Sequence, residues 1–167
     1  PYTSSAASDV YKRQGYHCRA MRLPGFAMTN EQYARSTIED WIEAVQEEVA
    51  TLKASHGRVH LVAHSLGAAI SLACETQKPG TFDSMSLVAP LISVSNARSP
   101  ILTTRQWQWV SRLLLVFTHS TFNPFPPDIK DPNAEDYPWG VPATPRSVSA
   151  QTLQLAKQIR PLADEIT

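Results

Sequence analysis

In the first half of the chain, some segments have the spacing of apolar residues that is typical of strands, and others have the spacing that is typical of helices. Residues 15–21, 58–63 and 84–89 are predicted to be short strands: the first leads to the turn-forming pair Pro24-Gly25, the second leads to Ser65, and the third is ended by Pro90. Residues 36–54 begin with the capping-box pattern Ser-Thr-Ile-Glu and then carry apolar residues at helical spacing, and residues 66–77 favour a second helix. The order strand, helix, strand, helix, strand predicts parallel strands joined by right-handed crossovers, which is an α/β fold.

The pattern changes after Leu91. Apolar residues from Trp107 to Phe117 predict a helix that either lines an acyl-chain or alcohol pocket or only covers the sheet. Seven prolines between residues 122 and 145 predict a rigid loop, and residues 149–159 predict another helix. We therefore interpret the segment after the third strand as a helical insertion over the carboxyl edge of the sheet.

The first residues have an unusual composition. Ser4 to Gln14 read Ser-Ser-Ala-Ala-Ser-Asp-Val-Tyr-Lys-Arg-Gln, and an allowed codon choice for the last six spells a transposase adapter used in sequencing libraries. We expect residues 1–14 to be translated adapter and the natural sequence to begin in mid-domain at Gly15. The expected organisation is then a core over residues 15–92, a helical cap over 93–160 and, at 161–167, the start of the return to the core.

Composition narrows the class of protein. With 43% hydrophobic and 18% charged residues the chain is typical of a globular domain. Basic and acidic residues number 15 each, and without the first 14 residues 13 basic and 14 acidic residues remain, so nothing predicts binding to nucleic acid or to an anionic membrane. Cys18 and Cys74 lack the spacing of metal or redox sites. No apolar stretch is long enough to predict a membrane span, and oligomeric state and compartment are left open.

One five-residue segment carries a chemical signal. Ala63-His64-Ser65-Leu66-Gly67 follows the apolar run that ends at Val62 and leads directly into a helix-forming stretch. A serine at a sharp strand-to-helix turn is typical of a nucleophile, because the turn exposes its hydroxyl. The turn is so tight that the residues two before and two after the serine must be small. Ala63 and Gly67 meet this demand, although the usual pattern has glycine at the first position. The alternative is an ordinary helix start with Ser65 as the N-cap.

The order of these features resembles the α/β-hydrolase superfamily, in particular its carboxylesterase and monoacylglycerol-lipase-like branch. The segments that carry the resemblance are Tyr16 to Gly25, which is similar to a strand followed by a Leu-Pro-Gly loop, then Thr37 to Trp41, and the serine turn at Ala63 to Gly67. The resemblance extends over nearly all of the chain after residue 14.

The resemblance implies a reaction and a set of roles. Ser65 would be the acyl-accepting nucleophile and the backbone N–H of Leu66 one oxyanion-hole donor, without metal or cofactor. The second donor would lie before Gly15, and the triad acid and histidine after Thr167, so this chain by itself would be inactive. We expect no catalytic role for the histidines within this chain or for the aspartates of the proline-rich loop. These residues are His17, His56, His60, His64, His119, Asp128, Asp131 and Asp136.

The expected function is therefore hydrolysis of a small-molecule carboxylic ester, a short-chain acyl ester or a monoacylglycerol, through an acyl-enzyme on Ser65. Two alternatives stay open at this point. One is a serine aminopeptidase or thioesterase of the same superfamily, and the other is a non-catalytic binding module that retains the serine turn.

Overall fold

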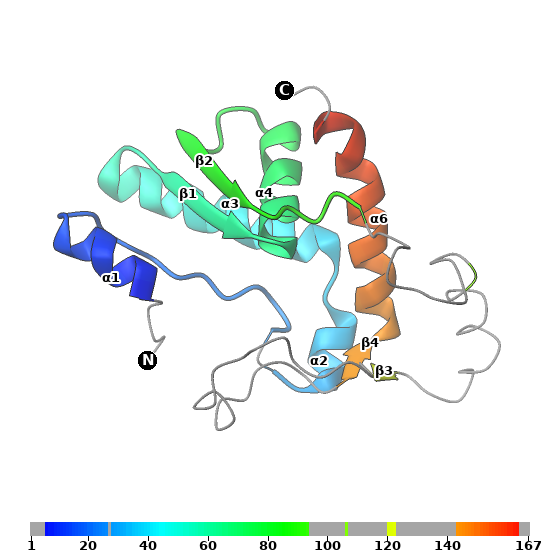
Figure 1. Ribbon diagram of the computed structural model, residues 1–167. Coiled ribbons are helices and arrows are strands. Elements are labelled where there is room, and N and C mark those ends of the chain that lie inside the picture. The colour runs from blue at the N-terminus through cyan, green and yellow to red at the C-terminus, as the bar shows by residue number, and fades with distance from the viewer. Residues whose placement is uncertain (1–5, 27, 94–105, 107–119, 123–142, 164–167) are drawn as a thin grey trace.

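The computed structural model describes residues 6–26, 28–93, 106, 120–122 and 143–163. The helices are α1 (Ala6–Arg13), α2 (Asn30–Arg35), α3 (Ile38–His56), α4 (Leu66–Gln77) and α6 (Arg146–Ala163). The strands are β1 (His60–His64), β2 (Ser84–Val88), β3 (Ser120–Phe122) and β4 (Ala143–Pro145). Figure 1 shows β1 and β2 side by side, with α4 next to them and α6 next to α4.

The central sheet is parallel, as the order of elements predicts. β1 and β2 pair in register from His60 opposite Ser84 to His64 opposite Val88, and α4 is the crossover between them. Asp83, just before β2, strengthens this pairing: its carboxylate accepts a hydrogen bond from the Val59 N–H at 2.9 Å, and this bond holds the pKa of the carboxyl below its usual value. The α/β fold class is thus confirmed for the described residues.

Two helices begin at complete capping boxes. Thr29 caps α2 with Gln32 as its reciprocal partner, and Thr37 caps α3 with Asp40. The sequence pattern placed the second box one residue too early, at Ser36 and Glu39, and it missed α2 altogether. α3 ends at His56 and is followed by the C-cap residue Gly57, whose φ of 80° lies in a region that glycine adopts without steric cost.

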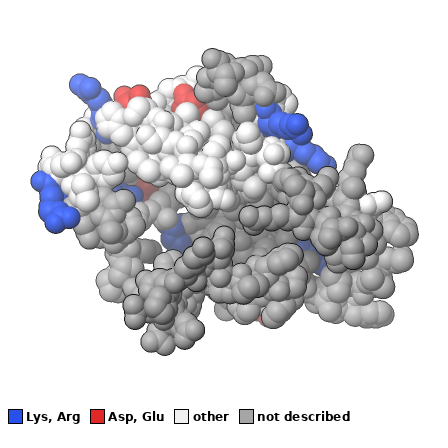
Figure 2. Space-filling view, viewed as in Figure 1, with Lys and Arg blue, Asp and Glu red and all other residues white. Residues whose placement is uncertain are grey.

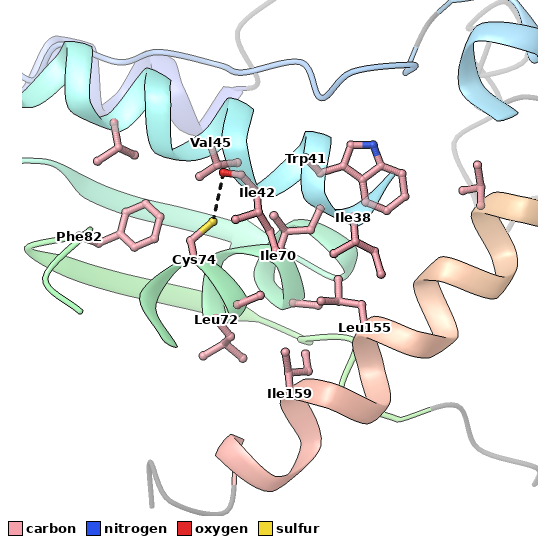
Figure 3. Close-up of a cluster of buried hydrophobic side chains, with 14 of the residues drawn as sticks. Ile38, Trp41, Ile42, Val45, Ile70, Leu72, Cys74, Phe82, Leu155 and Ile159 are labelled. Atoms are coloured by element: carbon pink, nitrogen blue, oxygen red, sulfur yellow. Dashed lines mark hydrogen bonds between the residues drawn. The ribbon is translucent and has the colours of Figure 1, made fainter. Parts of the chain in front are cut away.

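The core lies between the sheet and three helices. α4 is buried on all sides from Ala68 to Cys74, because α3 and α6 both pack against it. Figure 3 shows the side chains that meet there, with the Cys74 thiol directed to the Ile42 carbonyl oxygen at 3.7 Å. Burial raises the pKa of Cys74 to about 12, so this thiol is a structural residue of the core.

Only one face of the two-stranded sheet is covered within the described part of the chain. Burial alternates along both strands, and Leu61, Met85 and Leu87 point toward the helices. On the opposite face Val62 is 62% exposed and Val88 is 52% exposed. In Figure 2, which has the same orientation as Figure 1, most of the described surface carries no charged side chains. The coloured Lys, Arg, Asp and Glu side chains lie mainly toward the margins of that surface.

Several expectations require correction. Residues 15–21 form no strand, because no described strand pairs with them, and a strand exists only through a hydrogen-bonded neighbour. The stretch from 122 to 145 is not loop throughout, since β3 and β4 form an antiparallel pair at its ends. The helix predicted around Trp107 to Phe117 lies outside the described residues.

α6 extends beyond its predicted range and is tied to the rest of the fold by polar contacts. The Gln151 side chain accepts a hydrogen bond from the Ile38 N–H at 2.6 Å and donates one to the Ser36 carbonyl oxygen at 2.7 Å. The Ser147 hydroxyl donates to the Ala34 carbonyl oxygen at 2.7 Å. These bonds fix the start of α6 against the junction between α2 and α3, while Leu155 and Ile159 enter the core.

We predict that Gln151→Ala lowers the free energy of unfolding by about 1–3 kcal/mol, because it leaves a partly buried N–H and a carbonyl without their partner. The matched change Gln154→Ala removes the same side chain from an exposed position of α6 and should cost less than about 0.5 kcal/mol. Urea unfolding of both variants measures the difference. Equal losses would show that the Gln151 bonds contribute little.

Candidate functional site

Ser65 occupies the turn between β1 and α4. It directly follows His64, the last residue of the strand, and directly precedes Leu66, the first residue of the helix. Its backbone has φ 51° and ψ −116°, a combination that in turns is usually adopted by glycine. Such a conformation costs about 1–3 kcal/mol in a residue with a side chain, and it is held only where the surroundings enforce it.

The Ser65 backbone is hydrogen-bonded on both sides. Its N–H donates to the Val88 carbonyl oxygen at 3.0 Å, and its own carbonyl oxygen accepts from the Ala69 N–H at 3.1 Å and from the Leu91 N–H at 3.2 Å. The first bond continues the pairing of β1 with β2, and the second begins α4. The third comes from the chain just after β2, so three segments together enforce the strained conformation.

The Ser65 hydroxyl does not cap α4. No side-chain hydrogen bond to the first turn of this helix is formed, in contrast to α2 and α3, where threonine caps are fully bonded. The reading of Ser65 as an ordinary N-cap is therefore wrong. The partly buried side chain keeps its oxygen available for other chemistry.

The start of α4 gives the site its electrostatic character. The first N–H groups of any helix have no partner within the helix, and the helix dipole places partial positive charge beside them. The first turn of α4 carries no acidic residue to neutralise that charge. The backbone at Leu66, directly after Ser65, is therefore suited to stabilising a negative oxygen.

Ala63 and Gly67 flank the serine at the two positions where small residues were expected. Ala63 is partly buried in β1 opposite Leu87. At Gly67 an added Cβ would meet no atom within 4 Å among the described residues, apart from those of its chain neighbours and its own helix backbone. Apart from those, no described residue would clash with a Cβ at Gly67, and the need for a small residue there stays a prediction.

The described histidines all lie away from the Ser65 hydroxyl or have other partners. His64 is exposed on the outer face of the sheet, His60 contacts the Ser84 hydroxyl at 2.8 Å, and the rings of His17 and His56 stack at 4.5 Å. Within the described ranges no histidine or carboxylate is hydrogen-bonded to Ser65. His119, Asp128, Asp131 and Asp136 lie outside those ranges.

The described residues form no site of three other common kinds. They hold no group of three or more histidine, cysteine or acidic side chains placed to bind a metal ion. Neither cysteine in them forms a disulfide. No helix among them is long and apolar enough to span a membrane.

The turn after β2 is the feature of this site that the sequence did not indicate. Pro90 predicts only the end of the third strand, yet the segment from Val88 to Leu91 supplies two of the three backbone partners of Ser65. An Ala-Pro pair directly after a strand was the available signal, since proline restricts the residue before it.

Comparison with known proteins agrees with the geometry. A family model described as "Alpha/beta hydrolase family" matches residues 5–166 of this chain. None of the curated proteins compared with the chain matches it.

We predict that Ser65→Gly is more stable than Ser65→Ala by about 1 kcal/mol, because only glycine adopts a positive φ without steric cost. Both changes remove the hydroxyl, so the pair isolates the backbone strain. Thermal unfolding of the two variants measures it. A Ser65→Ala variant at least as stable as Ser65→Gly would mean that the turn is not strained in solution.

Proposed function

The chain belongs to the alpha/beta hydrolase family, and from this premise we propose that it is a serine hydrolase that cleaves carboxylic esters with Ser65 as its nucleophile. One observation carries the proposal: Ser65 has φ 51° at the junction of β1 and α4, and its hydroxyl is not used as a helix cap. Strained backbone at the carboxyl end of a parallel strand is typical of a functional residue.

The proposed reaction has two halves. A general base takes the hydroxyl proton while Ser65 Oγ bonds to the ester carbonyl carbon, and the resulting tetrahedral intermediate expels the alcohol, which takes up the proton. Water then attacks the acyl-enzyme with help from the same base, and the acid is released as Ser65 regains its proton. No metal or other cofactor is needed for either half.

We propose that the Leu66 N–H donates to the carbonyl oxygen as its negative charge develops. The support is its position at the first residue of α4, where the amide and the helix dipole act together and no acidic side chain competes. An oxyanion donor of this kind contributes on the order of 100-fold to 1000-fold in rate. The base and its orienting acid, as well as a second donor, are assigned to no described residue.

The substrate proposed is a short-chain acyl ester or a monoacylglycerol. An esterase, a thioesterase and an aminopeptidase of this superfamily share the acyl-enzyme, so the alcohol, thiol or amine that leaves distinguishes them. We propose that the expected cap over residues 93–160 selects among them, apart from α6, which packs in the core against α4. Rates with matched aryl ester, thioester and amino-acid anilide substrates will order the three activities.

We predict that a fluorophosphonate probe labels the full-length protein covalently at Ser65, because an activated serine in an oxyanion hole captures such electrophiles readily. Ser65→Ala should abolish labelling. Ser86→Ala, which removes an exposed hydroxyl from β2, is the matched control and should label as the wild type does. Mass spectrometry of the labelled peptide identifies the residue.

Labelling that persists in Ser65→Ala would exclude Ser65 as the nucleophile. A folded wild-type protein with no labelling and no turnover of any ester, thioester or anilide would favour the non-catalytic binding module instead.

We further predict that Ala63→Val disrupts the serine turn more than Ala63→Gly does. A branched side chain two residues before a strained serine has little room, whereas glycine restores the commoner pattern. The valine variant should lose about 1–3 kcal/mol of stability and most of its probe labelling. Equal behaviour of the two variants would show that the turn is not tight at Ala63.

A further inference from the structure

Two non-glycine residues in the described part of the chain have positive φ, and they lie next to each other. Ser65 has φ 51° and Ala89 has φ 44°. Each directly follows the last residue of a paired strand, because β1 ends at His64 and β2 at Val88. Since His64 and Val88 are opposite each other in the register, the two strained residues are neighbours at the carboxyl edge of the sheet.

A hydrogen bond connects the Ala89 turn to the serine. After Ala89 the chain bends back, so that the Leu91 N–H reaches the Ser65 carbonyl oxygen at 3.2 Å. A second tight bond, from the Ile92 N–H to the Pro90 carbonyl oxygen at 2.9 Å, completes the turn. Leu91 and Ile92 then pack against the core, which anchors the far side of the turn.

Nothing local in the sequence favours this conformation at Ala89. Alanine has no polar side chain that could stabilise a left-handed backbone, as asparagine or aspartate does. Pro90 restricts the residue before it still further. The strain at Ala89 is therefore balanced by its surroundings, and the bond from Leu91 to Ser65 is the contact that joins this turn to the serine turn.

We propose that Ala89 is a positioning residue for the nucleophile. Its left-handed backbone directs the Leu91 N–H to the Ser65 carbonyl oxygen, and the Val88 carbonyl oxygen holds the Ser65 N–H from the same side. The Ser65 peptide groups are thereby held between β2 and the start of α4, which fixes the direction of the Cα–Cβ bond that carries Oγ. This inference rests on the proposed function only for the chemical role of Ser65; the backbone contacts stand without it.

The test compares three variants of the full-length protein. Ala89→Val places a branched side chain at positive φ, where such residues are strongly disfavoured, and Ala89→Gly permits the conformation freely. Ala50→Val is the matched control, because it adds the same two carbons at an exposed position of α3. The readouts are amide hydrogen exchange at Ser65 and Leu91, the rate of fluorophosphonate labelling at Ser65, and the separate values of kcat and KM.

We expect Ala89→Val to speed exchange of the Leu91 amide and to slow Ser65 labelling on the order of tenfold to 100-fold, which is the scale of a small misplacement of a reacting group. The variant should lower kcat more than it raises KM, because it displaces the reacting serine and leaves substrate binding unchanged. Ala89→Gly should retain wild-type labelling with an equal or higher midpoint of thermal unfolding. Ala50→Val should match the wild type in exchange, labelling and kinetics.

The outcomes separate this inference from the proposed function. If the wild type is labelled at Ser65 but Ala89→Val labels equally fast, Ala89 does not position the nucleophile. If the wild type is not labelled, the proposed function fails, and Leu91 exchange alone then decides whether the contact depends on Ala89. Should Ala89→Val fail to fold, Ala89→Gly decides: a lowered unfolding midpoint or slower labelling in that variant overturns the inference.

Discussion

The backbone conformation of Ser65 is the constraint on which the rest of this structure depends. A serine with φ 51° and ψ −116° is unfavourable by about 1–3 kcal/mol unless its neighbours enforce it. Three backbone hydrogen bonds do so, from β2, from the turn after β2 and from the first turn of α4. None of them involves a side chain, so the sharpness of the turn follows from pairing β1 with β2 in register and from starting α4 immediately afterwards.

The helices behind the sheet determine the direction in which α4 leaves that turn. Ala68 and Ala69 are fully buried near its start, and such small side chains allow a helix to lie close to its neighbours. α3 packs on one side of α4 and α6 on another, and Gln151 joins these two outer helices through its bonds to the α2–α3 junction. The position of Ser65 thus depends on packing far along the chain as well as on its own turn.

The sequence predicted the parts of this fold that are specified locally. The range of α4 agrees at both ends, because a small-residue turn precedes it and Lys-Pro-Gly follows it. The strand expected at residues 15–21 did not form, since pairing depends on a partner that no local pattern reveals. For the site, Ser65 could be identified from its spacing between Ala63 and Gly67. The Ala-Pro pair marks a turn after β2, but the positive φ of Ala89 could not be predicted, because no property of the alanine side chain favours it.

The start of α4 after Ser65 differs from the starts of α2 and α3. α2 and α3 each begin with a threonine whose hydroxyl accepts a backbone N–H and whose third residue returns the bond. α4 begins with a serine that could do the same, yet its side chain makes no such bond. A missing N-cap bond costs about 0.5–2 kcal/mol, to which the strain at Ser65 is added. Burial of the whole stretch from Ala68 to Cys74 offsets both costs and anchors the helix, so α4 begins after Ser65 without a side-chain cap.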